Sequence, residues 1–245
     1  MIGTLAILGV AGLAHGIFGI GFAMIATPLL ALFLDYTTSL VLAAIPLLGM
    51  SAWWLATHRH ALLAERIPGR LLAGIATGSI LGVAVQSVLP ARASILLLAA
   101  LLAMSVCLPW LLKRWSAVDP QQVRRNSGAF AALAGFTESS LNVGAPFMVL
   151  FGALAHLKRV EQLIVLNLCF FLGKSIQVGL ISLTGTLGLT SPAMLLASTA
   201  VGLGGFIAGN ALAGRLLEAT FRRALNSFLI VIVVALLLRA GMSPQ

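Results

Sequence analysis

Charged side chains are scarce in this sequence. They make up 9% of its 245 residues, while 60% of the residues are hydrophobic. An average soluble domain carries roughly 25% charged residues. A chain with so few charges cannot cover a folded core with a polar surface. The composition therefore excludes an ordinary soluble protein and predicts an all-α polytopic membrane protein.

Metal-binding, catalytic and nucleotide-binding patterns are missing as well. The two cysteines, Cys107 and Cys169, lie singly inside apolar runs and lack the spacing of metal ligands. The sequence contains no nucleotide-binding loop and no cluster of His, Asp and Cys in the apolar segments. We therefore expect no cofactor, no metal, no enzymatic activity and no direct use of ATP.

Acidic residues are fewer than basic ones, six against fifteen, which gives a net charge of +9. In a soluble protein this excess would suggest a nucleic-acid partner. Here the basic residues cluster in short loops between apolar segments, a pattern typical of membrane orientation. We therefore expect the lipid bilayer, and no nucleic acid, as the partner of these charges.

What the sequence does contain is an internal repeat. Residues in one half return in the other at an offset of 123, or of 124 for the last pair. Two fused copies of one hydrophobic unit are a common plan for transporters, with the substrate site where the copies meet. The matched pairs are Ala11-Gly12 with Ala134-Gly135, Gly21 with Gly144, Leu34 with Leu157, and Pro68 with Pro192.

Each copy divides into four apolar segments, eight in all. They cover residues 3–34, 38–57, 69–89 and 93–112 in the first copy, and 128–156, 162–183, 192–213 and 224–240 in the second. The last three of each set have the length of a membrane-spanning helix, about 20 residues. We therefore expect a first membrane repeat (1–112), a cytoplasmic linker (113–127) and a second membrane repeat (128–245).

The first segment of each copy is too long for one straight crossing. About 30 helical residues extend ~45 Å, and the hydrocarbon core is about 30 Å thick. Small or helix-weakening residues interrupt both segments near the middle, including Gly16, Gly19 and Gly21 in one and Ser139, Asn142, Gly144 and Pro146 in the other. The segment is therefore either a long tilted helix or a re-entrant hairpin of two half-length helices.

The positions of Lys and Arg favour the hairpins. With two hairpins and six full crossings, twelve basic loop residues fall on one side and only Arg92 and Arg239 on the other. With eight crossings the division is eight against six, which ignores the tendency of basic residues to stay in the cytoplasm. We therefore expect two inverted repeats, each a re-entrant hairpin plus three transmembrane helices, with both termini periplasmic.

Hairpins that enter from opposite faces would bring their tips together near the middle of the bilayer. The half-helix after each tip would direct its free N–H groups and its positive dipole end toward the other tip, which suits an anion. The tips contain Gly19 and Gly21 in the first copy and Asn142 and Gly144 in the second. The alternative is that these small residues only permit close helix packing.

Lys174 lies near the middle of the 162–183 segment, with Asn167 and Gln177 on the same helix face. A charge at this depth costs ~2.5–3.5 kcal/mol on insertion scales, so it is usually paired or functional. Lys174 would supply a positive charge for an anionic substrate, assisted by Asn167 and Gln177. Alternatively, it forms a structural pair with Glu138.

Glu138 precedes the second tip and is followed by Ser139 and Ser140, whose hydroxyls are candidate donors to the substrate. A carboxylate beside an anion site repels the substrate unless it is protonated or paired. Glu138 is therefore a candidate proton carrier. His15, its match in the first copy, is a second candidate, with a satisfied polar contact as the alternative.

Two stretches resemble the TauE/SafE-type sulfite exporter family of bacterial permeases. They are AGLAHGIFGIGFAMIATPLLALF (11–33) and AGFTESSLNVGAPFMVLFGALAHLKRVEQ (134–162). The resemblance rests on the doubled unit, on a glycine-containing motif that opens each half, and on Pro28 and Pro146 shortly afterwards. It departs from the family pattern at Phe22-Ala23 and Ala145-Pro146, which replace a longer glycine run, and at the polar residues Glu138 and Asn142.

The resemblance implies sulfite, a sulfonate or a related organosulfur or carboxylate anion as substrate. Together with the anion site, it predicts a secondary transporter in the bacterial inner membrane that works by alternating access and is coupled to protons. The alternative is a passive anion channel. A second copy of the chain, in a homodimer, is a further candidate partner.

Cysteine labelling tests the expected topology. In a variant without Cys107 and Cys169, single cysteines in the 184–191 loop should react with a membrane-impermeant reagent from the periplasmic side, and cysteines in 158–161 should not. The reason is that the first loop would lie outside the cell and the second inside. Labelling of both loops from the same side would contradict the hairpins.

Overall fold

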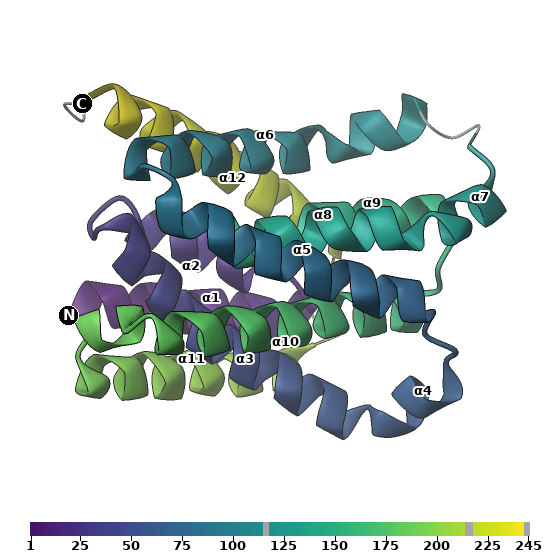
Figure 1. The fold of residues 1–245 in the computed structure, drawn as a ribbon, viewed down its shortest axis with the longest axis horizontal. Helices are drawn as coiled ribbons and strands as arrows, with labels where there is room; N and C mark the ends of the chain where they lie inside the picture. Colours follow the sequence, from purple (N-terminus) through teal and green to yellow (C-terminus); the bar gives the residue numbers. More distant parts are fainter. Residues whose placement is uncertain (115–117, 214–217, 243–245) are drawn as a thin grey trace.

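The computed structural model describes residues 1–114, 118–213 and 218–242, and every regular element in these ranges is helical (Figure 1). The all-α prediction is therefore confirmed for the described residues; residues 115–117 of the expected linker lie outside them. The elements are α1 (Ile2–Phe18), α2 (Phe22–Leu30), α3 (Tyr36–Thr57), α4 (Arg59–Ala64), α5 (Gly69–Val88), α6 (Ala91–Arg114), α7 (Pro120–Arg125), α8 (Ser127–Leu141), α9 (Ala145–Leu154), α10 (Arg159–Leu183), η1 (Thr186–Leu189), α11 (Pro192–Leu212) and α12 (Glu218–Met242).

Five of these helices are long and apolar enough to cross a membrane. They are α3, α5, α6, α10 and α11, with 20 to 25 residues each. At 1.5 Å per residue they extend for about 30 Å or more, which matches the hydrocarbon core. All five coincide with segments of spanning length in the sequence, and α12 contains a further apolar stretch, Leu225–Gly241. The chain is therefore a multi-pass membrane protein.

The two long first segments are each broken in the middle. The first forms α1 and α2, of 17 and 9 residues, and the second forms α8 and α9, of 15 and 10 residues. None of the four is long enough to cross about 30 Å of hydrocarbon as a straight helix. A single long tilted helix is therefore excluded for both segments.

Left-handed backbone conformations cause the two breaks. Gly19 ends α1 with a φ of 76°, and Asn142 ends α8 with a φ of 59°. This conformation is a common helix C-cap and is adopted readily by Gly and more readily by Asn than by most other residues. Gly19 and Asn142 are matched at the repeat offset, and so are Gly21 and Gly144, the N-caps of α2 and α9. The same local chemistry therefore breaks both segments.

Two pairs of helices approach so closely that only glycine fits between their backbones. A Cβ at Gly12 or Gly16 of α1 would overlap the carbonyl oxygens of Gly202 and Phe206 in α11. Small residues permit such contact between helices in a bilayer, where close packing stabilises association. The glycines are therefore required for this approach.

The second close pair is α5 with α8. A Cβ at Gly78 would overlap the carbonyl oxygen of Ala132, and one at Gly82 that of Phe136. Each close pair joins helices from different copies, because α1 and α5 belong to the first and α8 and α11 to the second. The longer arm of each broken segment therefore packs against the other copy.

Two short basic helices, α4 and α7, lie at one end of the bundle. In Figure 1 the short helices α4 and α7 lie at the end opposite to both termini. At that end Arg70 donates a hydrogen bond to the carbonyl of Arg124 (3.0 Å), and Arg124 donates one to the carbonyl of Ala155 (3.1 Å). At the other end Arg239 donates to the carbonyl of Leu34 (3.0 Å).

Two neighbouring glycines of α11 test the close packing. A Cβ at Gly205 would overlap the carbonyl oxygen of Gly9 in α1, whereas one at Gly204 would meet no atom within 4 Å. Gly205→Ala should lower the free energy of unfolding by about 1–3 kcal/mol, the usual cost of overpacking. Gly204→Ala should leave the Tm in detergent unchanged or slightly higher, because Ala favours a helix over Gly. Equal Tm values for the two variants would contradict the proposed role of the glycines.

Candidate functional site

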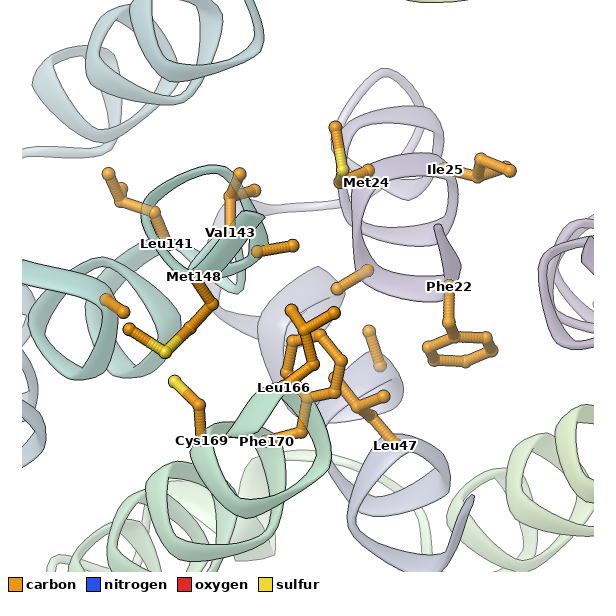
Figure 2. Close-up of a cluster of buried hydrophobic side chains, with 14 of the residues drawn as sticks. Phe22, Met24, Ile25, Leu47, Leu141, Val143, Met148, Leu166, Cys169 and Phe170 are labelled. Carbon is orange, nitrogen blue, oxygen red and sulfur yellow. The ribbon is translucent and has the colours of Figure 1, made fainter. Parts of the chain in front are cut away.

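A small cavity lies where the two breaks meet. Its volume is about 10 Å³, room for roughly one water molecule, and every residue around it is buried. Figure 2 shows part of its apolar surroundings, with Phe22 and Met24 from α2, Val143 from the second break, Leu47 from α3 and Phe170 from α10. The lining residues are His15, Gly21, Phe22, Ala23, Met24, Leu47, Glu138, Asn142, Val143, Ala145 and Phe170.

Residues matched by the repeat meet around this cavity. His15 and Glu138 lie 123 residues apart in the sequence and both line it, as do Phe22 and Ala145, the first helical residues of α2 and α9. Residues from both breaks are therefore in one place, which is the position where the sequence predicts an anion site.

The start of α2 offers N–H groups to the cavity. The backbone N–H groups of Phe22, Ala23 and Met24 have no hydrogen-bond acceptor among the described residues. These are the orphan donors of a helix N-terminus, and all three residues line the cavity. Together with the dipole of the helix they favour a negative charge at this point.

The start of α9 differs, because a carboxylate already occupies it. Glu138 Oε2 accepts a hydrogen bond of 2.8 Å from the backbone N–H of Gly144, the N-cap of α9. Glu138 Oε1 lies 2.8 Å from Lys174 Nζ, and both side chains are fully buried. One carboxylate therefore caps a helix and neutralises a buried ammonium.

Lys174 is fully coordinated in this structure. Besides the ion pair, its Nζ donates to the carbonyl of Glu138 (2.6 Å), to Gln177 Oε1 (2.8 Å) and to Asn142 Oδ1. Burying two charges is expensive unless they are paired and their remaining hydrogen-bonding groups are satisfied. The surroundings of Lys174 meet this condition, so the pairing alternative of the sequence analysis is realised. The amine faces the interior of the bundle, not lipid.

Asn142 connects both copies. Its side-chain Nδ2 donates to Thr27 Oγ1 in α2 and to the carbonyl of Leu40 in α3, each at 3.1 Å, while its Oδ1 accepts from Lys174. The left-handed backbone at this residue directs the side chain across the interface. An amide suits the place because it both donates and accepts hydrogen bonds.

The other polar residues of the expected binding set surround the ion pair and do not line the cavity. Ser139 donates to the carbonyl of Gly173 (3.2 Å), and its own carbonyl accepts from Gln177 Nε2 (2.7 Å). Ser140 donates within its helix to the carbonyl of Phe136 (2.6 Å). The hydrogen bonds of Ser139 and Gln177 hold the end of α8 against α10.

Two further members of the expected set have other surroundings. Asn167 donates to the carbonyl of Leu163 (2.9 Å), and its buried Oδ1 has no hydrogen-bond partner among the described residues. A Cβ at Gly19 would overlap the side chain of Leu163. Of the expected set, His15, Gly21, Glu138 and Asn142 line the cavity.

Sequence reasoning missed the apolar wall. Leu47 and Phe170 come from helices whose patterns gave no sign of a site, and Ala23 and Met24 belong to an apolar run. The departure from the family's glycine run at Phe22-Ala23 was the only signal, since these residues begin α2 directly at the cavity.

A second, larger cavity of about 250 Å³ lies beside the first, between the first break and helices α6, α9, α10 and α12. We call it the vestibule. Its lining includes Arg159 and Gln162, at the start of α10, and Leu112, near the end of α6. These residues lie toward the end of the bundle that carries α4 and α7. Met24 and Ala145 line both cavities and therefore separate them.

Within the described residues, no group of three His, Cys, Asp or Glu side chains is placed to hold a metal ion. Cys107 is exposed and Cys169 is buried in α10. The charged chemistry identified at the junction of the two breaks is thus the Glu138–Lys174 pair and the helix N-termini.

Comparison with known proteins agrees with the motifs. The family model of the sulfite exporter TauE/SafE matches residues 4–236, nearly the whole chain. No curated protein and no solved structure matches the chain. The resemblance that rested on residues 11–33 and 134–162 is confirmed.

The ion pair can be tested by removing one charge or both. Lys174→Met leaves the Glu138 carboxylate buried without its counter-charge, and breaking a buried pair in this way typically costs about 3–5 kcal/mol of stability. The Glu138→Gln/Lys174→Met double variant has no buried charge and should recover a large part of that loss. Unfolding in detergent measures both values. A double variant that is less stable than Lys174→Met would contradict the pairing.

Proposed function

This chain belongs to the sulfite exporter TauE/SafE family, and we propose that it is a secondary transporter of a small anion. The substrate would be sulfite, a sulfonate or a related organosulfur or carboxylate anion. The family is one of membrane transporters and not of enzymes, and the five long apolar helices agree with that role.

One observation carries the proposal. The N-termini of two half-helices, α2 and α9, meet at a buried cavity within a chain that spans a membrane. In a low-dielectric interior, the dipoles of both helices favour an anion at this point. Broken helices whose N-termini surround an anionic substrate are a known arrangement in secondary transporters.

The proposed binding set has an inner and an outer part. The backbone of Gly21 and the side chain of Asn142 lie at the cavity itself, and Gly19 and Gly144 shape the two turns. The outer part consists of Lys174, of Ser139 and Gln177 beside it, and of Ser140 and Asn167, which bond within their own helices.

Glu138 links substrate binding to a proton in this proposal. While its carboxylate is ionised, the charge of Lys174 is neutralised, and an anion gains little from the pair. A proton taken up by the carboxylate leaves the ammonium charge uncompensated, which attracts an anion to the adjacent cavity. Anion and proton would then move together. His15, which lines the same cavity, is the second candidate for proton binding.

We infer inverted repeats from the pattern of contacts. α1 packs on α11 as α8 packs on α5, α2 contacts α3 as α9 contacts α10, and α3 meets α10 while α6 meets α12. Each of these contacts thus has a counterpart after exchange of the two copies, 1–112 and 128–245. The α1–α2 and α8–α9 pairs would be re-entrant hairpins that enter from opposite faces. Of the eight apolar segments, six would then cross the membrane and two would form the hairpins.

The distribution of basic residues supports the orientation. α4 and α7, which carry Arg59, Arg124 and Arg125, lie opposite to both termini (Figure 1). Under the positive-inside rule their end is cytoplasmic, as is the 113–127 linker, so both termini are periplasmic in a bacterial inner membrane. A homodimer stays a prediction.

Alternating access would move pairs of helices in which one helix comes from each copy. Because α1 is locked to α11 and α8 to α5 by backbone contact, each hairpin would move with a helix of the other copy. The cavity is occluded in this structure, and Met24 with Ala145 separates it from the vestibule. An unbranched, flexible Met side chain is suited to such a position.

A passive anion channel is the alternative function. A channel needs a continuous path past the site, whereas the cavity at the breaks is surrounded by buried side chains such as Phe22, Leu47 and Phe170. This occlusion favours a carrier.

Flux through reconstituted vesicles tests the function. Uptake of labelled sulfite should rise several-fold under an inward proton gradient, because the proton on Glu138 frees the Lys174 charge. Glu138→Gln should remove this dependence on the gradient, and a protonophore should do the same for the unmodified protein. Sulfite preloaded inside should accelerate uptake by exchange. Uptake without exchange would indicate a channel, and equal gradient dependence in Glu138→Gln would contradict the coupling role.

A further inference from the structure

We propose that the first hairpin provides the principal hydrogen-bond donors to the charged oxygens of the substrate, through the N-terminus of α2 and the side chain of His15. The inference rests on the proposed function and specifies which groups would hold the substrate in the cavity. In the second hairpin the Glu138 carboxylate takes the equivalent place.

The asymmetry between the two helix N-termini is the first observation. Both α2 and α9 begin at the cavity, but only α9 has a carboxylate at its N-cap, where Glu138 Oε2 accepts from Gly144 N–H at 2.8 Å. No side chain caps α2. One of two matched anion sites is thus filled by the protein's own anion, and the other has donors without an acceptor.

His15 is the second, independent observation. Its side chain is 2% exposed and lines the cavity, and its Nδ1 has no hydrogen-bond partner among the described residues. A buried polar nitrogen without a partner is unfavourable and uncommon in a folded protein. The ring is held in place by Phe170 and Phe206, whose centroids lie 5.9 Å and 5.7 Å away. A ligand in the cavity would supply the missing acceptor.

The repeat explains why these two residues have opposite roles. His15 and Glu138 are matched at the offset of 123 and line the cavity from opposite hairpins. The carboxylate can only accept hydrogen bonds; its Oε2 accepts from the N–H of Gly144, and its Oε1 is ion-paired with the ammonium of Lys174. An imidazole that carries a proton can donate, so the first copy provides donors where the second copy provides an acceptor.

The geometry defines the chemical class of the ligand. Donors come from at least two directions, the first turn of α2 and the imidazole, so the ligand needs two or more acceptor oxygens on one small centre. The cavity in this structure has room for roughly one water molecule, less than the sulfur and three oxygens of sulfite need, so binding requires the cavity to widen and favours a compact head group. Once the cavity has widened, a sulfite-type oxyanion meets the requirement for several acceptor oxygens, whereas a halide offers a single atom.

The test compares sulfite binding to purified full-length variants by isothermal titration. His15→Phe keeps an aromatic ring against Phe170 and Phe206 but removes the donor. Hydrogen bonds to charged groups are the stronger class, so Kd should rise by roughly 10- to 100-fold. His15→Asn and His15→Gln place an amide N–H near the positions of the two ring nitrogens, and at least one should restore part of the affinity.

The control is His60→Phe, which alters an exposed histidine of α4 and should leave the Kd unchanged. Each variant's Tm without ligand shows that it is folded. If His15→Phe does not fold, the comparison of His15→Asn with His15→Gln decides, since a residue outside the site would give equal affinities near that of the unmodified protein.

The outcomes separate the two proposals. If the unmodified protein binds sulfite and His15→Phe binds it equally well, the role of His15 is wrong and the transport function stands. If the unmodified protein binds neither sulfite nor any sulfonate or carboxylate, the proposed function falls, and this inference falls with it. Equal affinity for chloride and sulfite would overturn the oxyanion class.

Discussion

The buried ammonium of Lys174 is the constraint on which the rest of the site depends. A charge at this depth is stable only with a counter-charge and a full set of acceptors. Glu138 provides the counter-charge, and Asn142 and Gln177 provide acceptors. Two of these residues also have a second role. Glu138 also caps α9, and Asn142 also bonds to α2 and α3. Satisfying one charge thus fixes the second break, the start of α9 and the contact between the copies.

The close helix pairs set what can move around this centre. Backbone contact at Gly12 and Gly16 binds α1 to α11, and contact at Gly78 and Gly82 binds α5 to α8. Both pairs join the two copies, so a simple separation of one copy from the other would break the tightest packing in the bundle. A change of access that preserves these pairs must instead move each broken segment together with its partner helix, past the α3–α10 contact near the centre.

The two halves are alike in backbone and different in charge. Gly19 and Asn142 have the same left-handed conformation, and Gly21 and Gly144 begin the same kind of short helix. Only the second half has a carboxylate and an ammonium at this point. The result is a cavity with an ion-paired carboxylate on one side and the N-terminus of α2, which no side chain caps, on the other.

Composition, repeat and glycine positions determined much of this protein from the sequence alone. They predicted the membrane class and the interruption of both long segments, because hydropathy and backbone conformation depend on local sequence. The pair of Lys174 with Glu138 was one of two alternatives that the sequence left open. Tertiary structure alone decided which polar groups face the cavity. Ser139 and Gln177 lie beside the ion pair, whereas His15 and the apolar Met24 line the cavity. Helical spacing gives the face on which a side chain lies, but the neighbour on that face comes from another helix, often more than 100 residues away, as Thr27 does for Asn142.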